Sequence, residues 1–296
     1  FGNPMSLKFS LVDPDRWLVK LAPLIKPLWN RWGLLLWLAL LGWSAALAQT
    51  APPSPTSQAA FSLKIEGPKD VAAWLLQHLE LQRYKDLTDL DETELQRLLQ
   101  SADEQAHELL ATLGYFSPTL QWQTQPGTGD SPPRQVRLTV TPGTPSVVNE
   151  VRIRLQGDIE QHPATQEQKQ VLLKQWPLGA GKNFSQANWS QAKSVALARL
   201  TSENYPLARL VESQALVDPD THTVRLSLTL DSGPRVMLGK AQVMGSERYG
   251  QEQAVRLARI KTGQAYRQSD LLEAQQRLVA SGFYDSVFVT LDTEGD

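Results

Sequence analysis

The sequence contains no cysteine among its 296 residues, and it has only three methionines and four histidines. Without cysteine there is no disulfide framework, no thiolate nucleophile and no zinc site built on sulfur. The chain also has no large surplus of either charge, because 29 Lys and Arg residues nearly balance 31 Asp and Glu residues. Such a chain lacks the basic surplus that contact with nucleic-acid phosphates requires. Nucleic acid is therefore not an expected partner.

Signatures of catalysis and metal binding are absent from the sequence as well. The histidines are scattered without a His-x-x-x-His pair, and we expect them at the surface: His78, His107, His162 and His222. The stretch Gly179–Lys182 resembles a phosphate loop only in part, because Trp176 and Asn183 replace the first Gly and the Ser/Thr of that motif. The acidic run Asp86–Glu94 lacks the alternating ligands and the Gly of a calcium loop. We expect a protein that is not an enzyme and that binds no cofactor or metal.

The one long apolar run extends from Trp32 to Trp43 and is shorter than the roughly 20 residues that a membrane-spanning helix needs. Basic residues precede the run, and Ala46-Leu47-Ala48 follows it with the small-x-small pattern of a secretory cleavage site. This pattern predicts a signal peptide over residues 1–48, with cleavage between Ala48 and Gln49. The alternative is a retained membrane anchor, because the region before the run is longer than most signal peptides.

Further expectations concern the N-terminal region. Met5 is the expected start, so that Phe1–Pro4 would not be native. The apolar residues concentrated near the N-terminus are expected to lie outside any folded core. Residues 49–60 are rich in Pro, Ser and Thr, which predicts a flexible lead. The folded part should begin near Phe61.

An internal repeat organises the rest of the chain. Three short segments alternate apolar and other residues and then reach a glycine, as expected of half-buried strands; they end at Gly67, Gly157 and Gly245. Downstream, each copy carries a residue type that accepts the left-handed conformation at a helix end, and an aromatic residue follows: Gly114 with Tyr115, Asn204 with Tyr205, and Gly282 with Phe283. The first two copies are offset by 90 residues at three independent landmarks, which chance does not explain.

Between the first strand and the helix end of each copy there is room for two helices. We predict helices over residues 71–81 and 92–113, 166–176 and 186–201, and 251–260 and 269–281, with Asp91 or Thr93, Ser185 and Ser269 as N-caps of the second helices. A further strand follows each helix pair, and a third occurs at 136–140 and 224–228. Each unit is therefore β-α-α-β-β, of the α+β class. The expected units are 61–148, 149–237 and 238–296, and the last lacks its third strand.

This tandem unit resembles the POTRA (polypeptide-transport-associated) domain, through its element order, the Gly-aromatic pair after the second helix, and the run 278–287. The stretches Leu113–Pro118 and Val140–Pro145 are similar to the TamA family within the Omp85/BamA superfamily. The resemblance implies the periplasmic part of a Gram-negative outer-membrane protein that assembles outer-membrane proteins and autotransporters. A membrane β-barrel, missing from this fragment, would follow the third unit.

The resemblance also implies partners and a binding mode. A TamB-like protein anchored in the inner membrane and unfolded client polypeptides are the expected partners. If the POTRA strand order holds, the second strand of each sheet is an edge that can take up an extended segment by β-augmentation. In the first unit this edge contains Thr119, Leu120, Gln121 and Trp122, and Trp122 is either a partner anchor or a core residue. The alternatives are the POTRA region of a BamA-type insertase and an FtsQ-like bitopic cell-division protein, which would carry one unit only.

Overall fold

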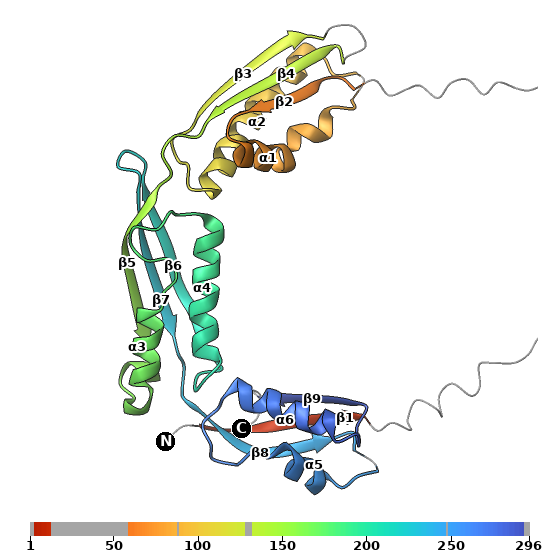
Figure 1. Ribbon diagram of the computed structural model, residues 1–296, viewed down its shortest axis with the longest axis vertical. Helices are drawn as coiled ribbons and strands as arrows, with labels where there is room; N and C mark the ends of the chain where they lie inside the picture. Colours follow the sequence, from red (N-terminus) through yellow and green to blue (C-terminus); the bar gives the residue numbers. More distant parts are fainter. Residues whose placement is uncertain (1–2, 13–58, 88, 128–131, 247, 293–296) are drawn as a thin grey trace, which may run out of the picture.

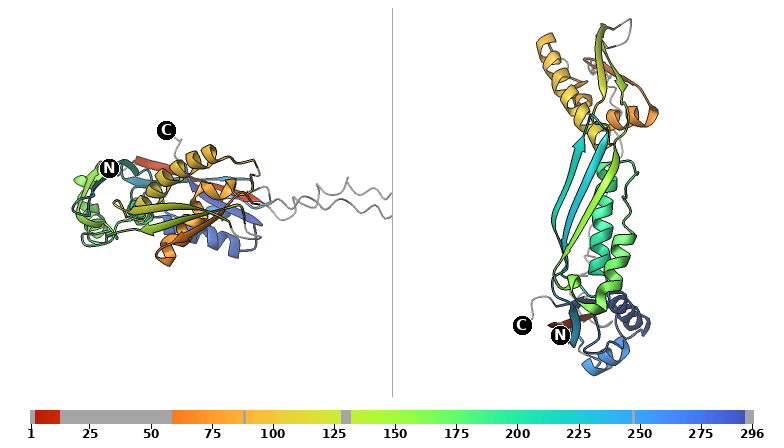
Figure 2. Two further views of the ribbon diagram at one scale, coloured as in Figure 1. Left: turned by 90° about the horizontal axis from the view of Figure 1, so that it is seen from above. Right: turned by 90° about the vertical axis from the view of Figure 1, so that its left-hand side faces the viewer.

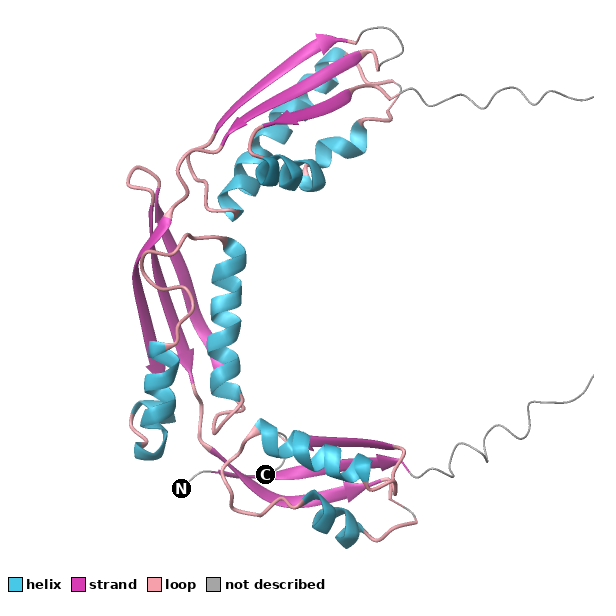
Figure 3. Ribbon diagram, in the orientation of Figure 1, coloured by secondary structure: helices cyan, strands magenta, loops and turns pink. Residues whose placement is uncertain are grey.

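The computed structural model describes residues 3–12, 59–87, 89–127, 132–246 and 248–292. Three units follow one another along a curved arc (Figures 1 and 2). Each unit has a three-stranded sheet with helices packed on one of its faces (Figure 3). The predicted α+β class and the tandem repeat are confirmed. The apolar run, the predicted cleavage site and residues 49–58 of the Pro-rich lead lie outside the described residues. Ala60, at the end of the predicted lead, is buried in the core of the first unit.

The first unit is built on an amphipathic helix over a short sheet. Its elements are, in chain order, β2 (Ser62–Glu66), α1 (Lys69–His78), the 3-10 turn η2 (Glu80–Tyr84), α2 (Glu92–Thr112), β3 (Thr119–Pro126) and β4 (Arg134–Thr141). Apolar residues of α2 recur every three or four positions, so that one stripe is buried: Leu95, Leu99, Ala102, Ala106 and Leu110. Asp91 is the N-cap, and its carboxylate accepts a hydrogen bond from the Glu94 N–H at 2.7 Å.

The second unit repeats this plan with longer strands. Its elements are β5 (Val147–Gln156), the 3-10 turns η3 (Asp158–Glu160) and η4 (Pro163–Thr165), α3 (Gln166–Lys174), α4 (Gln186–Thr201), β6 (Arg209–Asp218) and β7 (Thr223–Asp231). The predicted cap of α4 is confirmed, because the Ser185 hydroxyl accepts from the Asn188 N–H at 3.1 Å. In both units the first strand lies parallel to the third, and the second lies antiparallel to the third.

The third unit contains β8 (Val236–Met244), α5 (Gln251–Ala258), α6 (Gln268–Ala280) and β9 (Ser286–Leu291). The prediction that Ser269 caps α6 is wrong, since the N-cap is Arg267 and makes no side-chain capping bond. The reason is a contact with the second unit. The N–H of Gln268 donates to the carbonyl of Ser202 at 2.8 Å, so a backbone acceptor satisfies one free donor of the first turn.

The middle strand of the third sheet comes from the other end of the chain. β1 (Asn3–Val12) lies between β8 and β9, as the red strand beside the blue ones in Figure 1 shows. Leu7 and Phe9 are fully buried in the core of this unit. This differs from the expectation that the apolar residues near the N-terminus lie outside a core. In the sequence, Leu7 and Phe9 alternate with polar residues, as is typical of a half-buried strand. This strand was not predicted, because the apolar run Trp32–Trp43 indicated a signal peptide over the whole N-terminal region.

The backbone geometry at the ends of the second helices confirms the repeat. Gly114, Asn204 and Gly282 all have positive φ, at 95°, 61° and 71°. The aromatic residues that follow them are core residues, as predicted: Tyr205 is fully buried, and Tyr115 and Phe283 pack against the cores of their own units. The repeated pair, a helix terminator followed by an aromatic residue, therefore has a structural role in each unit.

Candidate polypeptide-binding edge

The second strand of every unit lies at an edge of its sheet. The strand orders are β2-β4-β3, β5-β7-β6 and β8-β1-β9, so β3, β6 and β9 each pair with one strand only among the described residues. This confirms the strand order on which the predicted edges depend. An open edge exposes backbone N–H and C=O groups that can pair with another extended chain.

Three of the edge strands, β2, β5 and β6, carry features that hinder such pairing. β5 has a register shift between Val148 and Glu150, and β6 has one between Leu210 and Glu212. β2 has five residues only and carries an ion pair of 2.8 Å between Lys64 and Glu66. Bulges, short strands and charged side chains are the usual protection against edge-to-edge association.

β3 lacks these features. It pairs with β4 over eight positions without a register shift, from Thr119 opposite Thr141 to Pro126 opposite Arg134. Its sequence, Thr-Leu-Gln-Trp-Gln-Thr-Gln-Pro, has no charged residue. A regular and uncharged edge of this length is the best template for strand addition among the sheets of the first two units.

The four residues singled out on β3 divide between its two faces. Thr119 and Gln121 are exposed, whereas Leu120 and Trp122 are half-buried against the core of the first unit. The indole Nε1–H of Trp122 donates to Asp103 Oδ1 on α2 at 2.8 Å. Of the two roles open to Trp122, this geometry favours the core role. Recognition at β3 would then depend on its backbone.

Exposed apolar residues lie on the second-strand edges of the other two units, β6 and β9. Val211 and Leu216 on β6 are 52% and 51% exposed, and Phe288 on β9 is 59% exposed. The second strands that the repeat predicts in the other two units, over residues 208–213 and 285–291, contain Val211 and Phe288. The alternation of the sequence alone does not show which of their side chains remain in solvent. β9 has six residues, no charge and no register shift with β1, so it resembles β3 in being unprotected.

The joints between units were not foreseen as sites. The Asn204 amide donates to Gln168 Oε1 at 3.1 Å, and its oxygen accepts from Arg235 Nε at 3.2 Å. At the other joint, the rings of Phe116 and Phe184 lie 6.0 Å apart between centroids, and Phe116 packs against the core of the second unit. In the sequence each unit passes into the next without linker residues, and this was the only sequence signal for these contacts.

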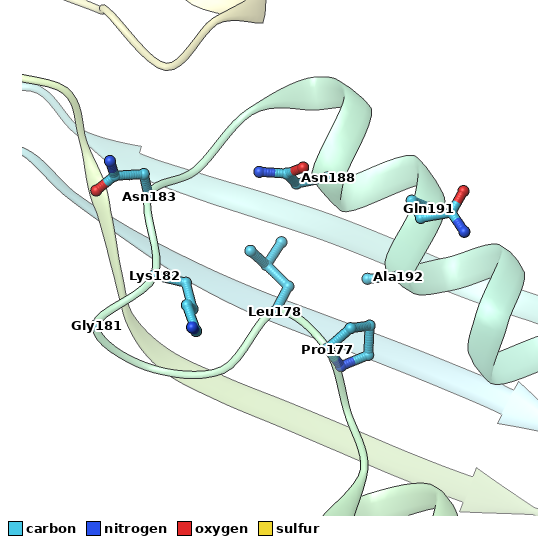
Figure 4. A pocket seen from close by; sticks show the side chains of 8 residues that line it. All are labelled: Pro177, Leu178, Gly181, Lys182, Asn183, Asn188, Gln191 and Ala192. Carbon is cyan, nitrogen blue, oxygen red and sulfur yellow. The ribbon is translucent and has the colours of Figure 1, made fainter.

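A hollow of about 460 Å³ lies beside the loop that resembles a phosphate loop (Figure 4). The backbone of this loop is already engaged: Gly181 N–H donates to Val148 at 2.7 Å, and Lys182 N–H to Gly179 at 3.3 Å. These donors are therefore not available to cradle a phosphate. The stretch is part of the turn that joins α3 to α4.

The described part of the chain offers neither a metal site nor a membrane-spanning helix. It contains no group of three or more His, Asp or Glu residues that could hold a metal ion. None of its helices combines the length and the apolar character that crossing a bilayer requires. The described surface thus offers strand edges and unit joints as its candidate sites.

The first unit matches a known family of domains. Residues 62–142 match the family model of the POTRA domain described as TamA domain 1. Among solved structures, the chain is similar to Haemophilus influenzae BamA POTRA3-5, at 18% identity and a TM-score of 0.43 over 81% of this chain and 92% of that one. It is also similar to POTRA1-3 of Omp85 from Anabaena, at 14% identity and a TM-score of 0.28 over 79% and 88%. The first unit thus matches the POTRA family, and the second and third units repeat its fold.

Proposed function

We propose that the chain is the periplasmic arm of an outer-membrane protein assembly and autotransporter translocation factor, of the TamA type within the Omp85 superfamily. The arm acts without catalysis by binding extended polypeptides. Its partners are a TamB-like protein that spans the periplasm from the inner membrane, and unfolded outer-membrane or autotransporter clients. The match of the first unit to a TamA POTRA family model supports this assignment.

The single observation that carries the binding mode is the regular, uncharged edge of β3. Strand addition at such an edge uses backbone hydrogen bonds, which every polypeptide can make. A factor that handles many clients needs this kind of recognition. The exposed side chains of Thr119 and Gln121 leave space for the side chains of an added strand.

The proposed location requires export. Cleavage between Ala48 and Gln49 would release a periplasmic chain that begins in the Pro-rich lead. The intact mass of the protein recovered from the periplasm or outer membrane tests this point. A mass that includes residues 1–48 would show that the N-terminal region is retained.

The edge is tested with Gln121→Pro, which removes one backbone N–H and distorts the strand. Two fluorescent probes are titrated by anisotropy: the periplasmic C-terminal domain of a TamB-like protein, and an unfolded peptide from a porin strand. We expect binding of both probes to weaken about tenfold, as the loss of one or two net hydrogen bonds predicts.

Gln121→Ala is the matched control, because it removes the same side chain and keeps the backbone N–H. It should bind both probes as the wild type does. Equal affinity of the proline variant and the wild type would refute binding at β3. Binding of the porin peptide without binding of the TamB-like domain would favour a BamA-type arm instead.

A further inference from the structure

The two joints between units are built by the same backbone hydrogen bonds. In each joint, the residue that ends the second helix of one unit accepts a bond from the start of the next unit, which in turn accepts one from an aromatic residue. The residues in this order are Gly114, Ser146 and Phe184 at the first joint, and Asn204, Val236 and Tyr266 at the second. These landmarks allow the other residues of the two joints to be compared position by position.

Three arginines distinguish the second joint from the first. Counted from the landmarks, the arginines Arg199, Arg235 and Arg267 correspond to Leu109, Pro145 and Ser185 of the first joint. None of the three residues in the first joint carries a charge. The shared fold of the joints therefore does not require a basic residue at any of these positions, which points to a role that the second joint alone has.

The three arginines line one hollow of about 490 Å³ at the second joint. Arg199 belongs to α4, Arg235 directly precedes β8, and Arg267 is the N-cap of α6. Glu167 and Glu203 line the same hollow, and among the described residues neither forms an ion pair with an arginine. The charged side chains of the lining thus leave one net positive charge, to which the N-terminus of α6 adds a partial one.

The guanidinium groups keep donors that the described part of the chain does not use. Arg235 Nε donates to the side-chain oxygen of Asn204 at 3.2 Å, and Arg199 Nη1 donates to the carbonyl of Gln175 at 2.8 Å. Each bond holds one nitrogen of its guanidinium and leaves the others without a partner among the described residues. The Arg267 side chain has no hydrogen bond or ion pair to any of them. Planar forks of this kind fit a carboxylate or a phosphate.

The rest of the lining decides between the possible anions. A phosphate group carries more than one negative charge and would meet the two glutamates, whereas a carboxylate matches the single net positive charge. Four of the twelve lining residues are apolar, namely Ala164, Val171, Leu172 and Ala265, which are too few to cover a long acyl chain. Val171 is 39% exposed, so an apolar side chain of a ligand could cover it. A polypeptide offers both groups, because side chains two residues apart lie on one face of an extended strand.

We propose that this hollow binds an acidic side chain of an extended polypeptide. Arg235 and Arg267 hold the carboxylate, and an apolar side chain of the same segment packs against Val171. Because the second and third units both line the hollow, a bound segment contacts both of them. The inference goes beyond the proposed function, since the edge of β3 recognises backbone in any polypeptide, whereas this site selects for charge.

The test uses the full chain and a fluorescent peptide with blocked ends, in which one Glu stands two residues from a Leu in a Gly-Ser sequence. A second peptide has Gln in place of the Glu. Binding is followed by anisotropy at low ionic strength, because salt screens partly exposed charges. We expect the wild type to bind the Glu peptide at least about fivefold more tightly than the Gln peptide. The variant with Arg235→Gln and Arg267→Gln combined should bind both peptides equally.

Arg235→Gln also removes the bond to Asn204, so Arg267→Gln is measured alone as well and should weaken binding of the Glu peptide about twofold to threefold. Arg256→Gln is the matched control, because Arg256 is an exposed arginine of α5 outside the hollow. This control should bind both peptides as the wild type does.

Three results would overturn the proposal. One is equal binding of the two peptides by the wild type, and another is a preference for the Glu peptide that survives the double substitution. The third is competition with the Glu peptide by inorganic phosphate or by laurate at concentrations where acetylated Leu-Thr-Glu amide does not compete. Binding at β3 would affect both peptides alike, so Gln121→Pro should leave the preference for Glu unchanged. The proposed function and this site can therefore fail independently.

Discussion

The carbonyl of Gly114 accepts a hydrogen bond from the backbone N–H of Ser146 at 2.9 Å, and 90 residues later Asn204 accepts one from Val236 at 2.8 Å. In both cases the residue that ends the second helix of one unit binds the start of the next unit. Phe184 N–H also donates to the carbonyl of Ser146, at 2.9 Å. The helix terminator is therefore part of the joint, and the joints restrict how the units turn relative to one another.

Gly114→Ala should disrupt the first joint. A Cβ at this position would lie 2.1 Å from the carbonyl oxygen of Phe184, and the residue would have to keep a φ of 95°. We expect a loss of about 1 to 3 kcal/mol from the strained backbone, and a further loss from the clash. Hydrogen exchange of the Ser146 and Phe184 amides, resolved by NMR, should become faster than in the wild type.

Gly282→Ala is the matched control for this prediction. Gly282 has a φ of 71°, but no heavy atom of the described residues lies within 4 Å of the Cβ that alanine would add. This variant should show the backbone strain alone, at about 1 to 2 kcal/mol. If both variants lose the same stability and the Ser146 amide stays protected, the joint does not depend on Gly114.

The helix ends show what the sequence could predict. Positive φ at Gly114, Asn204 and Gly282 is a local property of residue type, so the repeat revealed it directly. The start of α6 could not be predicted in this way, because its first donor is satisfied by Ser202 of the preceding unit. The same limit applies to the site. The edge position of β3 follows from the strand order, whereas the bond between Trp122 and Asp103 depends on tertiary packing.

The position of β1 in the third sheet was harder still to predict from the sequence. A segment separated by more than 200 residues from both of its neighbours leaves no local trace of where it pairs. Its alternating pattern was present in the sequence, but the apolar run that follows it suggested a signal peptide over the whole region. Comparison of Leu7–Leu11 with the middle strands of the other two units was the one sequence signal that could have placed it.

Tyr205→Phe should weaken the second unit at neutral pH. The Tyr205 hydroxyl lies 2.8 Å from Thr165 Oγ1, and both residues are buried. Thr165 Oγ1 also donates to the carbonyl of His162 at 3.2 Å, so its proton keeps an acceptor in the variant. We expect a loss of about 0.5 to 1.5 kcal/mol, measured by urea unfolding. Tyr115→Phe, at the equivalent but only half-buried position, should cost less.

The same substitution should change stability in alkali. Burial raises the pKa of the Tyr205 phenol above its ordinary value, and the hydrogen bond with Thr165 opposes this to a smaller extent. The unfolded chain therefore ionises first as the pH rises through about 10, and stability falls from there upward. Thermal unfolding between pH 8 and pH 11 should show a shallower decline for Tyr205→Phe than for the wild type. An unchanged slope would mean that Tyr205 does not contribute to the alkaline loss. Burial also raises the pKa of Tyr266, so part of the decline should remain in the variant.

Trp122→Phe separates the two roles considered for this residue. The indole N–H donates to Asp103 at 2.8 Å, and the ring packs against the core of the first unit. Since Asp103 is partly exposed, we expect a loss of about 1 kcal/mol in the stability of the first unit, visible as faster exchange in β4 and α2. Asp103→Asn keeps an acceptor oxygen and should lose less stability.

Because recognition at β3 depends on its backbone, both variants should bind the TamB-like domain and the porin peptide as tightly as the wild type. Weaker binding by Trp122→Phe with unchanged exchange would instead make the indole a partner anchor.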